Sequence, residues 1–97
     1  MDKNTATKYD ALLSVLCKSP NSSWHISHIA KEAEKVGFLT SNELQTAISV
    51  FMEDDFLDFI RHPNAPEHNF QIYTITNKGI KFISHEGGYS VNLDESF

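Results

Sequence analysis

Apolar residues recur at helical spacing in two stretches of the first half of the chain. Residues 9–16 place apolar side chains at i, i+3, i+4 and i+7, which predicts an amphipathic helix that ends before Pro20. Residues 27–36 repeat this periodicity, with Ser27 positioned to cap a helix and Gly37 positioned to end it. The pattern therefore predicts two short helices before residue 40.

A third helical stretch begins at Thr40, and Glu43 follows three residues later. This Thr-x-x-Glu pattern predicts a capping box, in which the Thr40 hydroxyl accepts from the Glu43 amide and the Glu43 carboxylate accepts from the Thr40 amide. Helical spacing places Leu44, Ala47, Ile48, Phe51 and Asp55 on one face of this helix. The opposite face comprises Asn42, Thr46, Ser49 and Glu53, flanked by Gln45 and Val50.

After this helix the apolar residues no longer follow a helical spacing. Residues 56–61 and 70–75 are rich in aromatic and β-branched side chains, which predicts two antiparallel strands. The connection between them, residues 62–69, contains Pro63 and Pro66 and is long for a hairpin, so we expect it to project as a wing. Thr76 is positioned to cap a last helix that ends at Gly87-Gly88. We expect residues 87–97 to form a loosely ordered tail.

The segment Tyr73-Thr-Ile-Thr-Asn-Lys-Gly79 resembles the Tyr-x-Leu-Thr-x-x-Gly pattern of winged helix-turn-helix regulators, with Ile75 where leucine is usual. The resemblance covers about residues 9–84. It implies an α+β fold over residues 1–86, with a three-helix core, a two-stranded β-hairpin wing and a C-terminal helix. The ending, residues 79–89, also resembles that of small, mostly uncharacterised bacterial winged-helix proteins that are transcription-regulator-like.

This resemblance implies double-stranded DNA as the partner, with the third helix in a major groove and the wing against phosphate or the minor groove. Base contacts would come from the outward face of that helix: Asn42, Gln45, Thr46, Ser49 and Val50. Backbone contacts would come from cationic side chains on neighbouring elements: Lys31, Lys35, Arg61 and Lys78, or Lys81 in place of Lys78. Four such contacts predict a slope of only about −3.6 in log salt, so useful affinity would require a dimer or another partner.

Charge supports an alternative partner. Eight Lys and Arg against thirteen Asp and Glu give a net charge of −5, and proteins that bind nucleic acid usually present a basic face. A polar helix face is also often simply solvated. The alternative is a protein-interaction or dimerisation module, with acidic residues 53–55 and Asp58 at the end of the third helix. Trp24 and Phe38 would either contribute to such an interface or close the ends of the core.

Composition and short motifs limit the classes of protein to which this chain could belong. A chain of 97 residues with 40% hydrophobic residues suits one domain, and no apolar run approaches the roughly 18 residues of a membrane span. A single cysteine, Cys17, and no signal-like start predict a cytoplasmic protein. No catalytic motif is present. His25-x-x-His28 with Cys17 lacks the paired spacing of a zinc site, as does His62 with His68, so we expect no enzyme activity, metal or cofactor.

Overall fold

A computed structural model describes residues 1–18, 23–60 and 72–94 of the chain. The described part is an α+β structure with five helices and a three-stranded antiparallel sheet. The elements are, in chain order, α1 (Lys3–Cys17), β1 (Trp24–His25), α2 (Ile26–Lys35), α3 (Ser41–Glu53), β2 (Leu57–Ile60), β3 (Ile72–Ile75), α4 (Asn77–Ser84) and α5 (Tyr89–Asp94). Among these helices, none has the length and apolar character that crossing a membrane requires.

The sheet has the strand order β1-β3-β2, so β3 pairs with both neighbours. Tyr73 of β3 lies opposite Phe59 of β2 on one side and opposite Trp24 of β1 on the other. The two strands predicted from aromatic and β-branched residues are confirmed as β2 and β3. Strand β1 was not predicted, because two residues are too few to show an alternating pattern. The predicted connection at 62–69 lies outside the described residues.

Helix α2 begins differently from the prediction. The predicted cap, Ser27, lies inside the helix, and His25 is the N-cap residue. The His25 Nδ1 atom accepts from the Ser27 amide at 3.1 Å, so an imidazole nitrogen takes the place of the expected hydroxyl oxygen. The other end agrees with the prediction. Gly37 has a φ of +106° just beyond the helix, a conformation that glycine adopts without a Cβ penalty.

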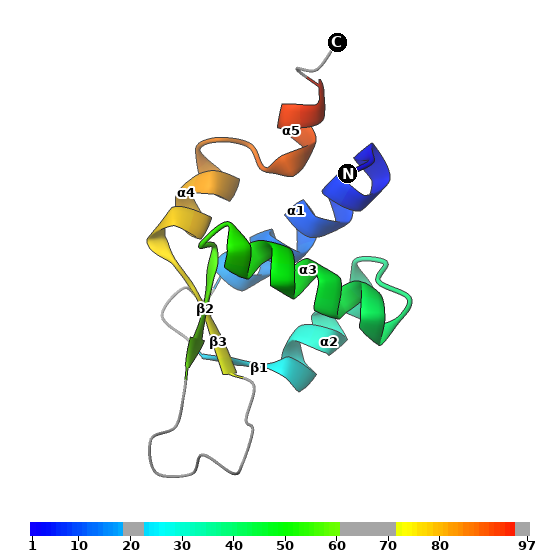
Figure 1. The fold of residues 1–97 in the computed structure, drawn as a ribbon, viewed down its shortest axis with the longest axis vertical. Coiled ribbons are helices and arrows are strands. Elements are labelled where there is room, and N and C mark those ends of the chain that lie inside the picture. The colour runs from blue at the N-terminus through cyan, green and yellow to red at the C-terminus, as the bar shows by residue number, and fades with distance from the viewer. Residues whose placement is uncertain (19–22, 61–71, 95–97) are drawn as a thin grey trace.

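The hydrophobic core lies between α1, α2, α3 and the sheet (Figure 1). The predicted apolar faces of the first and third helices are confirmed except at Asp55, which lies beyond the end of α3 and is exposed. The largest fully buried side chains are Phe51, Leu12, Leu13, Leu16, Ile29 and Leu57. Burying each such side chain contributes roughly 1.5–3 kcal/mol, so these residues fix how the helices pack. Helix α1 starts earlier than residue 9, because Asp2 caps it by accepting from the Thr5 amide at 2.7 Å, a hydrogen bond that lowers the pKa of the Asp2 carboxyl.

The segment that follows the glycine pair differs from the loose tail that was predicted. Residues Tyr89–Asp94 form α5, which packs beside the first half of α1 at the top of Figure 1. The Asp10 carboxylate of α1 accepts from the amides of Tyr89 and Ser90 at 2.6 and 3.0 Å. Gly88 has a φ of +85°, and a Cβ atom there would collide with the Asp10 carboxylate. The order in this segment thus comes from α1, which a local sequence pattern does not reveal.

Candidate nucleic-acid interface

The candidate interface is built on α3, whose start is held by both local and distant contacts. The Thr40 Oγ1 atom accepts from the Glu43 amide at 3.1 Å, as the capping-box pattern predicts. The Glu43 carboxylate accepts from the Leu39 amide at 3.0 Å, one residue before the amide that was predicted. Lys8 of α1 also pairs with Glu43, with 3.4 Å between Nζ and Oε2. These contacts tie the first turn of α3 to the core.

The outward face of α3 is polar and carries no basic residue. Leu44, Ala47, Ile48 and Phe51 are buried, in the helical phase that was predicted. The side chains predicted to contact bases are exposed or, for the last one, half-buried: Asn42, Gln45, Thr46, Ser49 and Val50. The Thr46 hydroxyl donates to the Asn42 carbonyl at 2.9 Å, which leaves its oxygen able to accept another hydrogen bond. The face therefore offers amide and hydroxyl groups with both donor and acceptor character.

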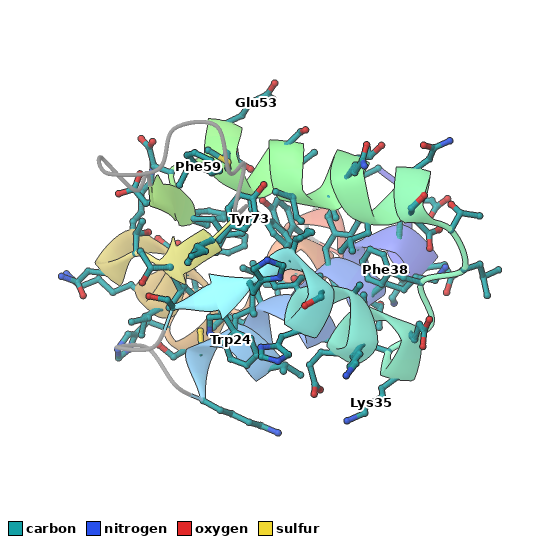
Figure 2. The ribbon with its side chains drawn as sticks, turned by 90° about the horizontal axis from the view of Figure 1, so that it is seen from below. Trp24, Lys35, Phe38, Glu53, Phe59 and Tyr73 are labelled. Carbon is teal, nitrogen blue, oxygen red and sulfur yellow. The ribbon has the colours of Figure 1, made fainter. Side chains whose placement is uncertain are left out.

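The predicted backbone contacts do not gather around this face. Figure 2 shows α3 along one edge of the molecule with Glu53 pointing outward, whereas Lys35 projects from the opposite edge. Lys31 is one helical turn before Lys35, so it lies on nearly the same side of α2. Lys35 also pairs with Glu32, three residues before it on α2, at 3.2 Å. The two lysines of α2 are thus directed away from the outward face of α3.

The other two predicted backbone contacts belong to later elements. Lys78 lies on α4, and its Nζ atom is 5.8 Å from the centre of the Phe56 ring, within the range of a cation–π contact. Arg61 lies outside the described residues. The directions of these side chains relative to α3 could not be predicted from sequence spacing, because the side chains belong to different elements.

The C-terminal end of α3 is acidic. Glu53, Asp55 and Asp58 are exposed, and Asp54 accepts from the Tyr89 hydroxyl at 2.6 Å. Burial and the neighbouring Asp54 carboxylate together raise the pKa of Tyr89 far above its usual range. Because three exposed carboxylates stand at this end, phosphate groups are repelled from it more than from the start of the helix.

Aromatic side chains form a row across the core face of the sheet. Trp24, Tyr73 and Phe59 lie opposite one another on three successive strands, and the rings of Tyr73 and Phe59 are 5.6 Å apart in an edge arrangement (Figure 2). Tyr73 is buried, Trp24 is half-buried and Phe59 is 36% exposed. Phe38 is buried against the Tyr9 ring instead of forming a rim. For Phe38 the core-closing alternative is therefore the one the structure supports.

Cys17 is half-buried against the hydrophobic core, and its burial raises the pKa of the thiol. A thiol with a raised pKa is a poor nucleophile and metal ligand at neutral pH. Over residues 1–18, 23–60 and 72–94 the structure brings together no group of three His, Cys, Asp or Glu side chains suited to a metal. His62 and His68 lie outside these ranges.

One surface feature was missed by the sequence reasoning. Leu39, in the turn between α2 and α3, is 86% exposed. It stands beside a groove of about 170 Å³ between the two helices, lined by Ala30, Ala33, Glu34, Phe38, Leu39, Thr40, Ser41 and Leu44. An apolar residue just before an N-cap usually packs on the residue four positions into the helix, here Leu44. That rule predicts that Leu39 is covered, so its exposure could not be predicted from the sequence.

Comparison with known proteins identified no relative of this chain. The chain matches no protein-family model, no curated protein and no solved structure. The function of the protein is therefore inferred from its residues and their arrangement alone.

Proposed function

We propose that this chain is a winged helix-turn-helix domain. The order of the described elements supports this: α1, β1, α2 and α3 are followed by the antiparallel pair β2 and β3, and then by α4. The turn between α2 and α3 spans five residues, 36–40, in keeping with the short connections of helix-turn-helix motifs. In this proposal β2 and β3 form the base of the wing, and α3 is the recognition helix.

We further propose that the domain binds double-stranded DNA as a transcription regulator. The observation that carries this proposal is the row of exposed amide and hydroxyl side chains on α3: Asn42, Gln45, Thr46 and Ser49. Asparagine and glutamine pair bidentately with the adenine edge in the major groove, and serine and threonine hydrogen-bond several bases. Val50 would contact a thymine methyl group. A cytoplasmic location belongs to the same proposal.

Phosphate anchoring is expected to be weak in this protein. Lys31 and Lys35 project away from the outward face of α3, so Arg61 and Lys78 are the remaining candidates for backbone contacts. Two such contacts correspond to a slope of only about −1.8 in log salt, half of what four contacts give. Binding by one copy should therefore depend on base contacts more than on charge.

A second function is favoured by a specific observation. The acidic end of α3 lies near exposed apolar side chains, Met52 and Phe59, each 36% exposed. Carboxylates beside exposed apolar groups suit a protein partner better than a polyanion. The alternative proposal is therefore a protein-interaction module that has this fold without DNA binding.

One binding experiment separates the two functions. Fluorescence anisotropy of a labelled random-sequence duplex is measured against increasing protein, at low salt and near physiological salt, and bound sequences are then enriched from a random library. DNA binding predicts an enriched motif and a gentle salt dependence. Absence of binding at low salt would contradict the DNA proposal and leave the protein-interaction function.

The role of α3 is tested with a matched pair of triple variants. Replacing Asn42, Thr46 and Ser49 together with alanine should preserve folding, because all three side chains are exposed, and should weaken binding to an enriched site at least tenfold. The control replaces the same residue types on the exposed side of α1, namely Asn4, Thr7 and Ser14. Equal affinities of the two triple variants for the enriched site would contradict the assignment of α3 as the recognition helix.

A further inference from the structure

The turn between α2 and α3 presents an apolar side chain and a concave surface next to each other. Leu39 is 86% exposed, more than any other large apolar side chain whose burial is described. The adjoining groove of about 170 Å³ has apolar walls from Ala30 and Ala33 of α2 and from Leu44 of α3. The small alanines leave this space open, because their methyl groups do not reach across the gap between the helices.

The exposed leucine is held by a rigid turn. The Leu39 amide donates to the Glu43 carboxylate at 3.0 Å, and Glu43 is in turn paired with Lys8 of α1 at 3.4 Å. The neighbouring Phe38 is buried and stacks with the Tyr9 ring at 6.0 Å between centroids. Because both the amide and the preceding side chain are fixed, Leu39 loses little backbone freedom when a partner covers it.

We propose that this surface binds a second copy of the chain through a two-fold axis, with Leu39 of each copy inserted in the groove of the other. A two-fold interface uses the same patch on both subunits, so it needs a surface that is complementary to itself. Here the projecting leucine and the groove that receives it belong to one patch. The exposed side of α2 beside this patch carries both a positive and a negative charge, so a uniformly basic or acidic partner would complement only one of them.

Two charged residues of α2 are also complementary between copies. Glu34 lines the groove, and Lys31 lies one turn before it on the exposed side of the helix. Lys31 and Glu34 are exposed on α2, one turn apart, and within the described part of the chain neither forms an ion pair. In an antiparallel contact between two α2 helices, Lys31 of each copy faces Glu34 of the other. Both pairs form at once, so the two-fold arrangement leaves neither Lys31 nor Glu34 without an opposite charge.

This inference goes beyond the proposed DNA-binding function and does not rest on it. Self-association is measured without DNA, so a monomeric protein that binds DNA would contradict the dimer alone, and a dimer without DNA binding would contradict the DNA function alone. The contact adjoins Asn42 at the start of α3. A DNA duplex that covers Asn42 and a second copy should therefore compete for the same end of this helix.

The first test is sedimentation velocity of the full chain over a concentration series. We expect a reversible monomer–dimer equilibrium in the wild-type protein. One buried leucine contributes roughly tenfold in affinity, and the dimer loses two in Leu39→Lys, so its dissociation constant should rise at least about a hundredfold. The control is Val91→Lys, which makes the same charge change at a 39% exposed apolar residue of α5, away from both proposed binding surfaces. Circular dichroism and thermal unfolding establish that both variants fold.

The second test uses charge reversal to identify the two-fold contact. Lys31→Glu and Glu34→Lys should each weaken self-association, because each brings like charges together across the axis. A mixture of the two variants should form heterodimers, since every pair across the axis again has opposite charges. The control mixture contains Lys18→Glu and Glu86→Lys, which carry the same charge changes at exposed positions elsewhere. Each control variant should associate like the wild type.

Three results would overturn the proposal. The first is a wild-type protein that stays monomeric at all accessible concentrations. The second is a dimer that Leu39→Lys and Val91→Lys weaken equally. The third is a mixture of Lys31→Glu and Glu34→Lys that associates no better than either variant alone.

Discussion

Phe51 fixes the rotational orientation of α3. Its side chain is fully buried, and its ring meets Tyr9 edge-on with 5.5 Å between centroids. Met52, the next residue, is 36% exposed. The orientation of the polar face follows from that of Phe51, because each residue of a helix is rotated by 100° from the one before it. A single buried ring thus determines which side chains of α3 meet a ligand.

Replacing Phe51 with alanine should lower the free energy of unfolding by about 3–5 kcal/mol, since it removes a buried ring and leaves a cavity. Chemical denaturation measures this loss. The control is Met52→Ala, whose loss should be much smaller because that side chain remains partly in water. Similar losses in the two variants would show that the helix is rotated from the described orientation.

Helix α5 illustrates how an element depends on distant residues. Asp10 accepts from the Ser90 hydroxyl at 2.6 Å as well as from the two amides at the start of α5. The Tyr89 ring packs among aromatic rings of three other helices and of the segment before β2: Tyr9, Phe51, Phe82 and Phe56. The helix has only six residues, too few to be stable without such contacts.

Replacing Asp10 with alanine should therefore loosen α5 without disrupting the other helices. The variant leaves two amides and a hydroxyl without their acceptor, with an expected cost of about 1–3 kcal/mol. Hydrogen exchange should speed up over residues 89–94 while the amides of α3 stay protected. Asp2→Ala is the control, because it also removes a carboxylate acceptor from α1, but one that accepts from the Thr5 amide of the same helix, at a cost of about 1 kcal/mol. Unchanged exchange in α5 of Asp10→Ala would contradict this role.

At the scale of the whole molecule, burial of tyrosine makes stability dependent on alkaline pH. Burial raises the pKa of Tyr9 and Tyr73, and for Tyr9 the charge of Glu43 raises it further. Tyr89 has a raised pKa for the same primary reason, together with its hydrogen bond to Asp54. These side chains stay protonated in the folded protein at a pH at which they ionise in the unfolded chain.

The free energy of unfolding should consequently be independent of these tyrosines below about pH 10, the unfolded pKa, and fall as pH rises above it. The sign follows because the unfolded chain then binds fewer protons than the folded one. Denaturant unfolding at a series of pH values measures the effect, with tyrosinate absorbance as a second readout. Tyr89→Phe should show a shallower decline than the wild type. A stability that is flat or rising through this range would contradict the assignment.

The sequence by itself determined the features that depend on neighbours within one or two helical turns. The buried faces of α1 and α3 follow from the spacing of apolar residues. The caps at Thr40 and Thr76 follow from the sequence too, because each hydroxyl accepts from an amide only three residues later. The exposure of Asn42 and Thr46 was predictable for the same reason. These features are local, so a short stretch of sequence contains all the groups involved.

Only the tertiary structure decided how these elements face one another. Asp10 and Tyr89 are 79 residues apart, yet their contact orders α5. The direction of Lys35 relative to α3 and the open groove beside Leu39 likewise depend on how α2 packs against α3. Helical spacing places a side chain around its own axis, whereas relative directions on two elements depend on the packing of the whole core. This is the physical reason why the polar face was predictable and its surroundings were not.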